Sequence, residues 1–471
     1  MDTKELKQYQ KMVFTPISKL IVSLSIPTVI SMLTTMIYNL ADAYFVGKLG
    51  TSASAAIGIV MGVQALFQAF GFMFGHGAGS IIGRKLSEGK RNEADKFLTI
   101  SFFSSIIIGT IITIISFMFL DKFMVLLGST DTILPYSRKY AFYILISGPA
   151  LGASCVLNNV MRYEGRAFLS MVGLVSGGVL NIIGDPILIF GFDLGIDGAG
   201  LSTALSLYIS LFILLFMFLS GKTISRIKLS SVTCLGKDKI ISNFILIIKT
   251  GFPSLIRQSL NGFSTMALNR CSMPYGDAAI AAMTIAGRVM MFISSILIGI
   301  GQGFQPVSAF NFGAKKYKRL KSSYFFTLKM GVGLMAVFGI IGFIFTDNII
   351  AIFRDDLEVI NYGIPSLRCM CIGVIFAPLS VVANMLFQSI GKSKTASFLA
   401  LMRSGLFYIP IIIILPIFIG FAGIQSAQMC ADLLSAACSM PFVIAYFKKL
   451  PKEDEITEKD NEVKKLIVHS S

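Results

Sequence analysis

The chain has 471 residues, of which 54% are hydrophobic and only 14% are charged. Its repeated apolar runs reach the length of about 20 residues that a bilayer crossing needs, which predicts a multi-pass membrane protein and excludes an ordinary soluble domain. The formal net charge of +16 does not indicate nucleic-acid binding, because Lys and Arg gather in short segments between the apolar runs.

The apolar runs predict about twelve membrane-spanning helices. They lie near residues 17–46, 52–80, 95–120, 134–159, 167–190, 197–219, 244–268, 278–308, 322–346, 358–388, 395–418 and 423–447. The first run lacks a cleavage site of small residues, so we expect it to remain as a helix. An even number of spans puts both termini on one side, and the basic segments 84–96, 222–239 and 315–321 indicate that this side is the cytoplasm.

An internal repeat appears when the sequence is compared with itself at a shift of 226 residues. The matched pairs include Pro27 with Pro253, Gly50 with Gly276, Asn158 with Asn384, and Gly165 with Gly391. Each half then holds six helices, and this even number makes the halves run in the same direction, as in parallel repeats related by an axis along the membrane normal. We therefore predict an all-α polytopic membrane protein of twelve transmembrane helices in two six-helix bundles.

The repeat also sets the predicted domain boundaries. They are a cytoplasmic N-terminal segment 1–16, a first bundle 17–220, a cytoplasmic linker 221–243, a second bundle 244–447 and a cytoplasmic tail 448–471.

Two carboxylates stand inside the apolar runs of the first half. Asp42 lies about 37 Å along the first span and Asp185 about 27 Å along the fifth, so both are predicted at the depth of the outer leaflet. Tyr38 and Asn181 each precede one of these acids by four residues and therefore share its helix face. Thr203 near the outer end of the sixth span, and Tyr143 in the fourth, could reach the same level.

These acids need an explanation because an unpaired carboxylate inside a membrane costs several kcal/mol. The repeat matches Asp42 with Leu268 and Asp185 with Ile411, so the same positions are built without acids in the second half. The spans of the first half carry Lys and Arg only near their ends, at Lys19, Lys96, Arg138 and Lys139. We therefore predict that the two acids hold a proton or a metal cation. The alternative is that Asp42 caps a helix end or extends to the outer interface.

The second half carries three arginines at apparent mid-membrane depth, Arg257, Arg288 and Arg403, with Asp432 as the only acid away from the ends of its spans. Buried charges are usually paired, so we predict a structural ion network around Asp432. The alternative is a cationic patch in a central cavity that meets anionic groups of a substrate.

Other chemistries are not supported by the sequence. The segment SIGKSKT has Leu386 where a phosphate-binding loop needs its first glycine, which argues against ATP-driven transport. Neither of the two histidines stands near a plausible nucleophile, so a triad enzyme is not predicted. The seven cysteines show no paired metal-ligand spacing, and we expect neither disulfides nor a structural metal.

Several longer motifs carry a family resemblance. They are LADAYFVGKLG after the first span, GAGSIIGRKLSEGK after the second, RYEGR after the fourth, LNIIGDPILIFGFDLGIDGAGLSTALS through the fifth and sixth, and GIGQGFQPVSAFNFGAKK after the eighth. With these motifs the chain resembles the multidrug and toxic compound extrusion (MATE) family, and most of all its bacterial multidrug exporters, from Pro27 to Tyr446.

The resemblance implies two six-helix bundles around a central cavity, and export of amphipathic, often cationic, compounds driven by inward H⁺ or Na⁺. It implies that Asp42, Asn181 and Asp185 couple transport to the cation and could hold Na⁺, with Tyr38, Tyr143 and Thr203 as further matches. We expect the substrate cavity to include Tyr143, Asn158, Asn261 and Arg288. We expect no cofactor besides the coupling ion, no nucleic acid, and a monomer in the cytoplasmic membrane.

The sequence therefore predicts a cation-coupled antiporter that works by alternating access and is not an enzyme. A flippase for lipid-linked oligosaccharides or lipids, of the same superfamily, is the alternative that the three arginines of the second half keep open. A channel or receptor is disfavoured, because nothing in the sequence indicates a pore-lining ring or a ligand-binding domain.

Overall fold

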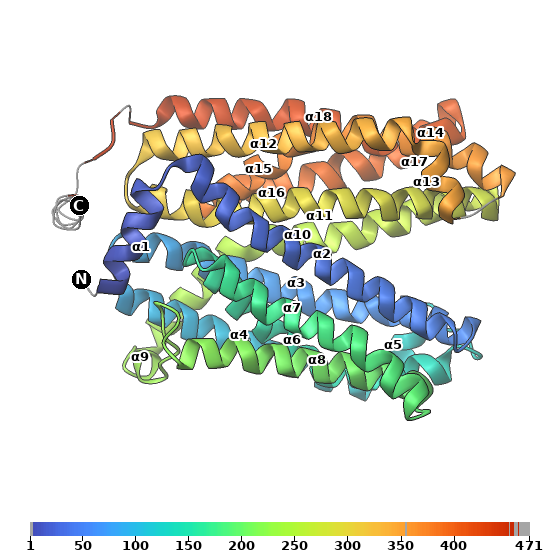
Figure 1. Ribbon diagram of the computed structural model, residues 1–471, viewed down its shortest axis with the longest axis horizontal. Helices are drawn as coiled ribbons and strands as arrows, with labels where there is room; N and C mark the ends of the chain where they lie inside the picture. Colours follow the sequence, from blue (N-terminus) through green and yellow to red (C-terminus); the bar gives the residue numbers. More distant parts are fainter. Residues whose placement is uncertain (1–2, 354–355, 452, 456–459, 461–471) are drawn as a thin grey trace. The chain divides into compact units, whose positions relative to one another are not determined.

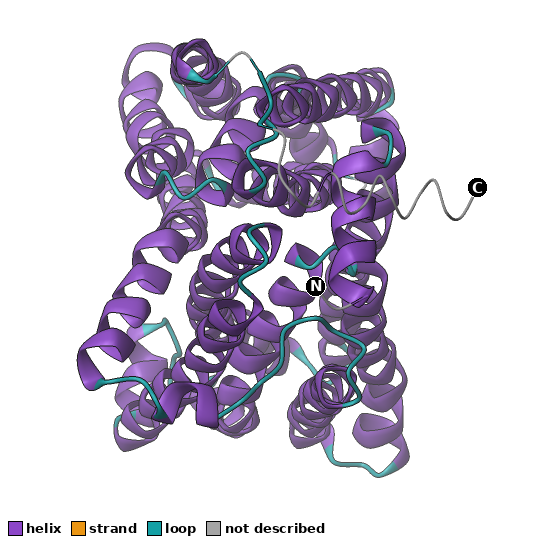
Figure 2. Cartoon of the chain, turned by 90° about the vertical axis from the view of Figure 1, so that its left-hand side faces the viewer, coloured by secondary structure: helices purple, strands orange, loops and turns teal. Residues whose placement is uncertain are grey.

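The structure is a computed structural model of the chain, and it describes residues 3–353, 356–451, 453–455 and 460. Residues 1–2 of the predicted N-terminal segment, and most of the predicted tail 448–471, lie outside the described residues. All regular structure in the described part of the chain is helical, as Figures 1 and 2 show. This confirms the predicted all-α class.

The helices that begin in the first half of the chain are α1 (Thr3–Phe14), α2 (Ile17–Gly47), α3 (Thr51–Ser87), α4 (Arg91–Met118), α5 (Leu120–Leu126), α6 (Leu134–Tyr163), α7 (Ala167–Pro186), the π-helix η1 (Ile187–Gly191), α8 (Gly195–Leu219) and α9 (Ser230–Thr233). Those that follow are α10 (Lys237–Ser272), the short η2 (Met273–Tyr275), α11 (Asp277–Gly313), α12 (Tyr317–Ile344), α13 (Thr346–Phe353), α14 (Leu357–Val374), α15 (Ala377–Ser389), α16 (Ser393–Leu401), the π-helix η3 (Met402–Phe407), α17 (Tyr408–Ile419) and α18 (Phe421–Lys449).

The number of spans agrees with the prediction. Within the described residues, 11 helices are long and apolar enough to cross a membrane, and α14 with α15 forms a further, bent span that makes up to 12. The predicted span 358–388 is thus not straight but bends by 47° between α14 and α15. Pro378 explains the bend, because it has no N–H to donate to the carbonyl four residues earlier, at Val374, and its ring clashes with that carbonyl.

The chain forms two compact units. Unit 1 comprises the described residues up to Tyr9 together with Ile30–Leu255, and unit 2 comprises Gln10–Val29 together with the described residues from Ile256 onward. In unit 1, α3, α4, α6, α7 and α8 pack side by side (Figure 1), and in unit 2 the same is true of α11, α12, α14, α17 and α18.

Two helices change unit along their length, and they do so at equivalent points. α2 passes from unit 2 to unit 1 after Val29, and α10 passes from unit 1 to unit 2 after Leu255. These two residues are separated by the repeat shift of 226, and each lies two residues after a proline, Pro27 or Pro253. A proline inside a helix removes one backbone hydrogen bond, so each helix has a weak point where its two segments meet.

The repeat is visible in the backbone and in a matched hydrogen bond. Gly50 and Gly276 have φ of 124° and 89°, a region that favours glycine, and both immediately precede a long helix. Asn158 Nδ2 donates to the Ser170 carbonyl at 3.0 Å, and Asn384 Nδ2 donates to the Ala396 carbonyl at 2.6 Å. The two units therefore use the same polar contact to hold a pair of successive helices together.

The predicted linker 221–243 lies within unit 1, and buried polar groups attach it to the helices of that unit. The Glu164 carboxylate, just beyond α6, accepts from the backbone N–H of Ile224 and of Ser225, at 2.8 Å each. Asp95 accepts from the Arg226 N–H at 2.8 Å and pairs with the Lys228 ammonium at 3.2 Å. These contacts satisfy backbone groups that a loop would otherwise leave to water.

Candidate functional site

The C-terminal parts of α2 and α7 and the N-terminal parts of α6 and α8, all in unit 1, carry a cluster of buried polar side chains. It consists of Asp42 on α2, Tyr140 on α6, Asn181 and Asp185 on α7, and Thr203 on α8. Asp185 is 0% exposed and Asp42 is 7% exposed, although both side chains are carboxylates. Burial of this kind requires hydrogen bonds, counter-charges or protonation.

Hydrogen bonds connect the members of this cluster. The Tyr140 hydroxyl donates to Asp42 Oδ2 at 2.9 Å. Asn181 Nδ2 donates to Asp185 Oδ1 at 3.2 Å and to Thr203 Oγ1 at 3.1 Å. Asp42 and Asp185 also lie close enough for their charges to interact. These bonds form two sets on four helices, and the interaction between the two carboxylates relates one set to the other. We refer to the two sets together as the polar network.

Three oxygens of the network lack a hydrogen-bond donor among the described residues. Oδ1 of Asp42, Oδ2 of Asp185 and Oδ1 of Asn181 are buried and have no hydrogen-bond partner among the described residues. Within the same residues neither carboxylate forms an ion pair with Lys, Arg or His. Oxygens from two carboxylates and an amide are acceptors only, so a proton or a hard cation such as Na⁺ would satisfy them.

Local sequence explains how α7 can present two of these oxygens. Pro186 follows Asp185 directly and cannot donate to the carbonyl of Ile182, and the helix continues as the π-helix η1. Gly184 allows α8 to approach closely, because a Cβ atom there would lie 2.6 Å from Ser202 Oγ. The close approach lets Asn181 reach the hydroxyl of Thr203.

The structure brings together four of the five residues predicted for cation coupling: Asp42, Asn181, Asp185 and Thr203. The fifth, Tyr38, lies one turn before Asp42 and packs against Gly178 of α7. Tyr143, predicted at the same level, packs instead against Gly200 of α8. The functional role of each of these residues stays a prediction.

Sequence reasoning missed Tyr140, which bonds Asp42. Tyr140 is six residues from the start of α6 and Asp42 is five residues from the end of α2, so each is about 8 or 9 Å from that end of its helix. Counting depth from the end of α2 and the start of α6, rather than from the start of α2, would have placed the two side chains at one level.

The polar residues predicted in the second half are distributed differently. Arg403 Nε pairs with Asp432 Oδ1 at 2.6 Å, and the Asp432 side chain is 3% exposed. Arg257 Nη1 donates to Asn384 Oδ1 at 3.5 Å. Arg288 is exposed on α11 and Asn261 is exposed on α10. The structure thus gives Asp432 one arginine partner, and the wider network and the cavity role of Arg288 and Asn261 stay predictions.

Asn158, predicted to line the substrate cavity, is buried and holds α6 to the start of α7 through the bond to Ser170 described above. Its repeat equivalent Asn384 makes the matching bond in unit 2. A shared structural contact accounts for both residues, and a role in substrate binding stays a prediction.

The family match, the relatives in sequence and the solved structures all indicate the same kind of protein. The chain matches the MatE family over residues 27–187 and 253–414, the two halves of the repeat. It is 28% identical to the multidrug export protein MepA of Staphylococcus aureus (strain MSSA476) over 445 residues, which cover 94% of this chain and 96% of that protein. It is 29% identical to MepA of Staphylococcus saprophyticus over 421 residues, covering 89% and 92%.

Solved structures show the same fold. An outward-facing multidrug resistance MATE family transporter of the MOP superfamily superimposes with a TM-score of 0.88 at 24% identity, covering 95% of this chain and 99% of that one. A MOP superfamily transporter from Pyrococcus furiosus gives the same TM-score, identity and coverage.

Proposed function

Since the chain belongs to the MatE family and has the fold of multi-pass membrane transporters rather than of enzymes, we propose that it exports amphipathic, often cationic, drugs or toxic compounds in exchange for H⁺ or Na⁺. Relatives named multidrug export proteins over more than nine-tenths of the chain support this substrate class. The flippase alternative is weaker, because Arg403, one of the three arginines that favoured it, is neutralised by Asp432.

The observation that carries the cation coupling is the set of three unsatisfied oxygens on Asp42, Asn181 and Asp185. Two adjacent buried carboxylates repel each other when both are ionised, so a bound proton or Na⁺ removes a cost that the empty site bears. The donor set fits either ion, because Na⁺ is held by oxygen ligands and a carboxylate oxygen accepts a proton.

The proposed mechanism uses the weak point of α2. Pro27 leaves the Ser23 carbonyl without its helical donor, and the part of α2 that carries Asp42 belongs to unit 1 from Ile30 onward. When the cation neutralises Asp42, this part of α2 can move toward Asp185 on α7 without bringing two charges together. The movement narrows the part of the substrate cavity that unit 1 lines, and so favours release of the substrate.

The experiment that tests this function is drug transport by everted membrane vesicles that contain the full chain. A fluorescent cationic drug should accumulate in the vesicles when an H⁺ or a Na⁺ gradient is imposed, and accumulation should stop when that gradient is collapsed. Transport that depends on added ATP, or that proceeds without an ion gradient, would contradict the proposal. The gradient that suffices identifies the coupling ion.

We also propose that the protein lies in the cytoplasmic membrane as a monomer with both termini in the cytoplasm. The excess of Lys and Arg in segments 84–96 and 315–321 supports this orientation. Cys234 is exposed in the segment between α9 and α10, and a membrane-impermeant thiol reagent should label it in everted vesicles but not in intact cells. The reverse pattern would contradict the orientation.

A further inference from the structure

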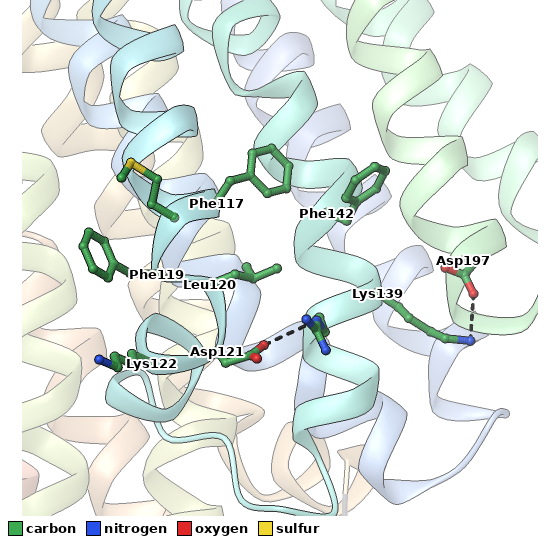
Figure 3. Close-up of a pocket in the computed structure, with 10 residues that line it drawn as sticks. Phe117, Phe119, Leu120, Asp121, Lys122, Lys139, Phe142 and Asp197 are labelled. Atoms are coloured by element: carbon green, nitrogen blue, oxygen red, sulfur yellow. Dashed lines mark ion pairs between the residues drawn. The ribbon is translucent and has the colours of Figure 1, made fainter.

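Unit 1 has a second polar feature, an open cavity of about 770 Å³ at the ends of its helices, remote in sequence from the acids of the coupling site. Its walls come from the end of α4, from α5, from the first turns of α6 and from the start of α8 (Figure 3). All of its lining residues belong to unit 1. The cavity lies at the end of these spans opposite to the segment between α3 and α4.

One part of the cavity wall consists of apolar side chains, several of which are exposed. Phe117 and Phe142 face each other with ring centroids 5.6 Å apart, and Figure 3 shows them on the same level. Met118 is 71% exposed and Phe119 is 53% exposed at the end of α4. Apolar side chains gathered at the end of a membrane span are suited to the interfacial part of a bilayer, where the acyl chains begin.

The part of the wall one helical turn closer to the end of the span carries cationic side chains. Arg138 and Lys139 precede Phe142 by four and three residues, so they lie on the same face of α6, one turn closer to the end of the span. Lys122 on α5 contributes the third cation of the wall. In Figure 3 Asp121, Lys122 and Lys139 lie below the two phenylalanines. Charged side chains at this depth are at the level of lipid headgroups.

Two carboxylates pair with two of the three cations and leave the wall with a net positive charge. Arg138 Nε pairs with Asp121 at 3.4 Å, and Lys139 pairs with Asp197 at 3.1 Å. The arginine and lysine side chains are 64% and 60% exposed, and exposed pairs of this kind contribute little stability. The fork of Arg138 also carries two Nη groups that can donate to phosphate oxygens. Three cations and two carboxylates leave the wall with one positive charge.

We propose that this cavity binds an anionic phospholipid of the bilayer, with its phosphate against Lys122, Arg138 and Lys139 and its acyl chains against Phe117 and Phe142. Apolar contacts and cationic donors one helical turn apart match the two parts of such a molecule. The residual positive charge of the wall favours an anionic over a zwitterionic headgroup.

Unit 2 provides an internal comparison, because the repeat supplies the equivalent positions. Phe117 corresponds to Phe343, Asp121 to Asp347 and Phe142 to Arg368. Arg368 pairs with Asp347 at 3.3 Å and lies over the Phe343 ring, 5.4 Å from its centroid. A neutral pair therefore stands where unit 1 has an apolar wall.

The three cations are also missing from unit 2. Lys122, Arg138 and Lys139 correspond to Asn348, Ile364 and Pro365. The proposed lipid site is therefore a property of unit 1 alone, and Arg368 is a control that also pairs with an aspartate at the end of its span, although its side chain is less exposed than that of Arg138.

The test is native mass spectrometry of the purified full chain, titrated with phosphatidylglycerol or with phosphatidylcholine of identical acyl chains. The parent protein should retain phosphatidylglycerol preferentially. Because each cation near a headgroup contributes about fivefold in affinity, the double variant R138Q/K139Q should weaken this binding about 25-fold. The control Arg368→Gln should change it by less than about twofold, and the charge-conserving Arg138→Lys should retain most of it.

Three results would overturn the proposal. Equal binding of the two lipids would show that the headgroup charge is not recognised. Undiminished phosphatidylglycerol binding by R138Q/K139Q, or an equal loss in Arg368→Gln, would place the lipid elsewhere. Displacement of the lipid by soluble glycerol phosphate at similar concentration would indicate a site for free phosphate instead. Unfolding temperatures of all variants should match that of the parent, because the exchanged side chains are exposed.

Discussion

The two units share a repeat but differ at the coupling site. Unit 1 carries Asp42 on α2 and Asp185 on α7, whereas unit 2 carries Leu268 and Ile411 at the equivalent positions, both packed against one apolar core cluster. Asn181 corresponds to Phe407, which packs against the same cluster. Unit 2 therefore forms the same arrangement of helices with apolar side chains at these positions, so the fold does not require the polar network of unit 1.

The buried charges of the two units also differ in how they are satisfied. Asp432 in unit 2 has an arginine partner at 2.6 Å, whereas Asp42 and Asp185 in unit 1 each have one buried oxygen with no hydrogen-bond partner among the described residues. A paired charge is suited to structure and an unpaired one to exchange of a cation. The comparison supports the proposal that unit 1 carries the coupling site and that the ion pair of unit 2 has a structural role.

The largest effect is expected from Asp42→Asn. The amide keeps an acceptor for the Tyr140 hydroxyl, so the protein should fold, but it cannot take up or release a proton and has lost its negative charge. Gradient-driven drug efflux from everted vesicles should fall to the level of vesicles without the protein. The matched control is Leu268→Ala at the equivalent position of unit 2, which should keep coupled transport. Equal losses in both variants would break the comparison between the units.

Arg403→Met in unit 2 should act on stability instead. It leaves the Asp432 carboxylate, 3% exposed, without its partner, which typically costs about 3–5 kcal/mol. The double variant R403M/D432L removes both charges and should recover most of the loss, measured by thermal unfolding in detergent. If the double variant is stable but does not transport, the pair has a functional role and the division between the units fails.

A smaller effect concerns the attachment of the segment between α8 and α10 to unit 1. Burial raises the pKa of Glu164, which lies just beyond α6, and the hydrogen bonds from Ile224 and Ser225 oppose this only in part. The folded protein therefore binds the proton more tightly than the unfolded chain does. Its free energy of unfolding should fall as the pH rises from the ordinary Glu value of 4.5 through the raised pKa, by at most about 1.4 kcal/mol per pH unit.

The matched variant Glu164→Gln is uncharged at every pH, so this part of the pH dependence should disappear. Unit 2 has Ile390 at the equivalent position and offers no such group. Thermal unfolding of the parent and the variant across this pH range measures the difference. An unchanged slope in Glu164→Gln would assign the pH dependence to other groups.

Much of the fold and of the coupling site could be predicted from the sequence because both depend on regular spacing. The lengths of the apolar runs predicted the membrane spans. The four-residue spacing of Asn181 and Asp185 predicted that the two side chains share one helix face, and their hydrogen bond of 3.2 Å agrees with this. The bend after Val374 could have been predicted from Pro378, since a proline rarely leaves a helix straight.

Other features could not be predicted, because they depend on contacts between distant segments. The repeat indicates which residues are equivalent, but not which neighbours they pack on, so the change of unit along α2 and α10 was not foreseen. The hydrogen bond between Tyr140 and Asp42 depends on how α6 packs against α2, and the π-helices η1 and η3 have no clear signal in the sequence.

The smallest predicted effect compares two equivalent turns, the one after α3 and the one after α11. Gly89 has φ of 77°, and its repeat equivalent Lys315 has φ of 58°, a conformation that costs a side-chain-bearing residue about 1 kcal/mol. The Lys315 ammonium pairs with Glu455 at 2.7 Å, and both side chains are about half exposed, so this pair contributes little stability. Glycine also has more conformational freedom in the unfolded chain, which costs about 0.5–1 kcal/mol. In Lys315→Gly this cost and the lost pair together nearly offset the relief of strain.

Salt separates these two contributions. At low ionic strength Lys315→Gly should leave the unfolding temperature almost unchanged. In about 1 M NaCl, where the pair with Glu455 is screened, the variant should be more stable than the parent by the small amount that the pair contributes at low salt. The control Lys315→Gln loses the pair but keeps the strained backbone, so it should be slightly destabilised at low salt and equal to the parent at high salt. If Lys315→Gly is less stable than Lys315→Gln in high salt, the left-handed turn of unit 2 stores no strain, and its likeness to the glycine turn of unit 1 has no energetic consequence.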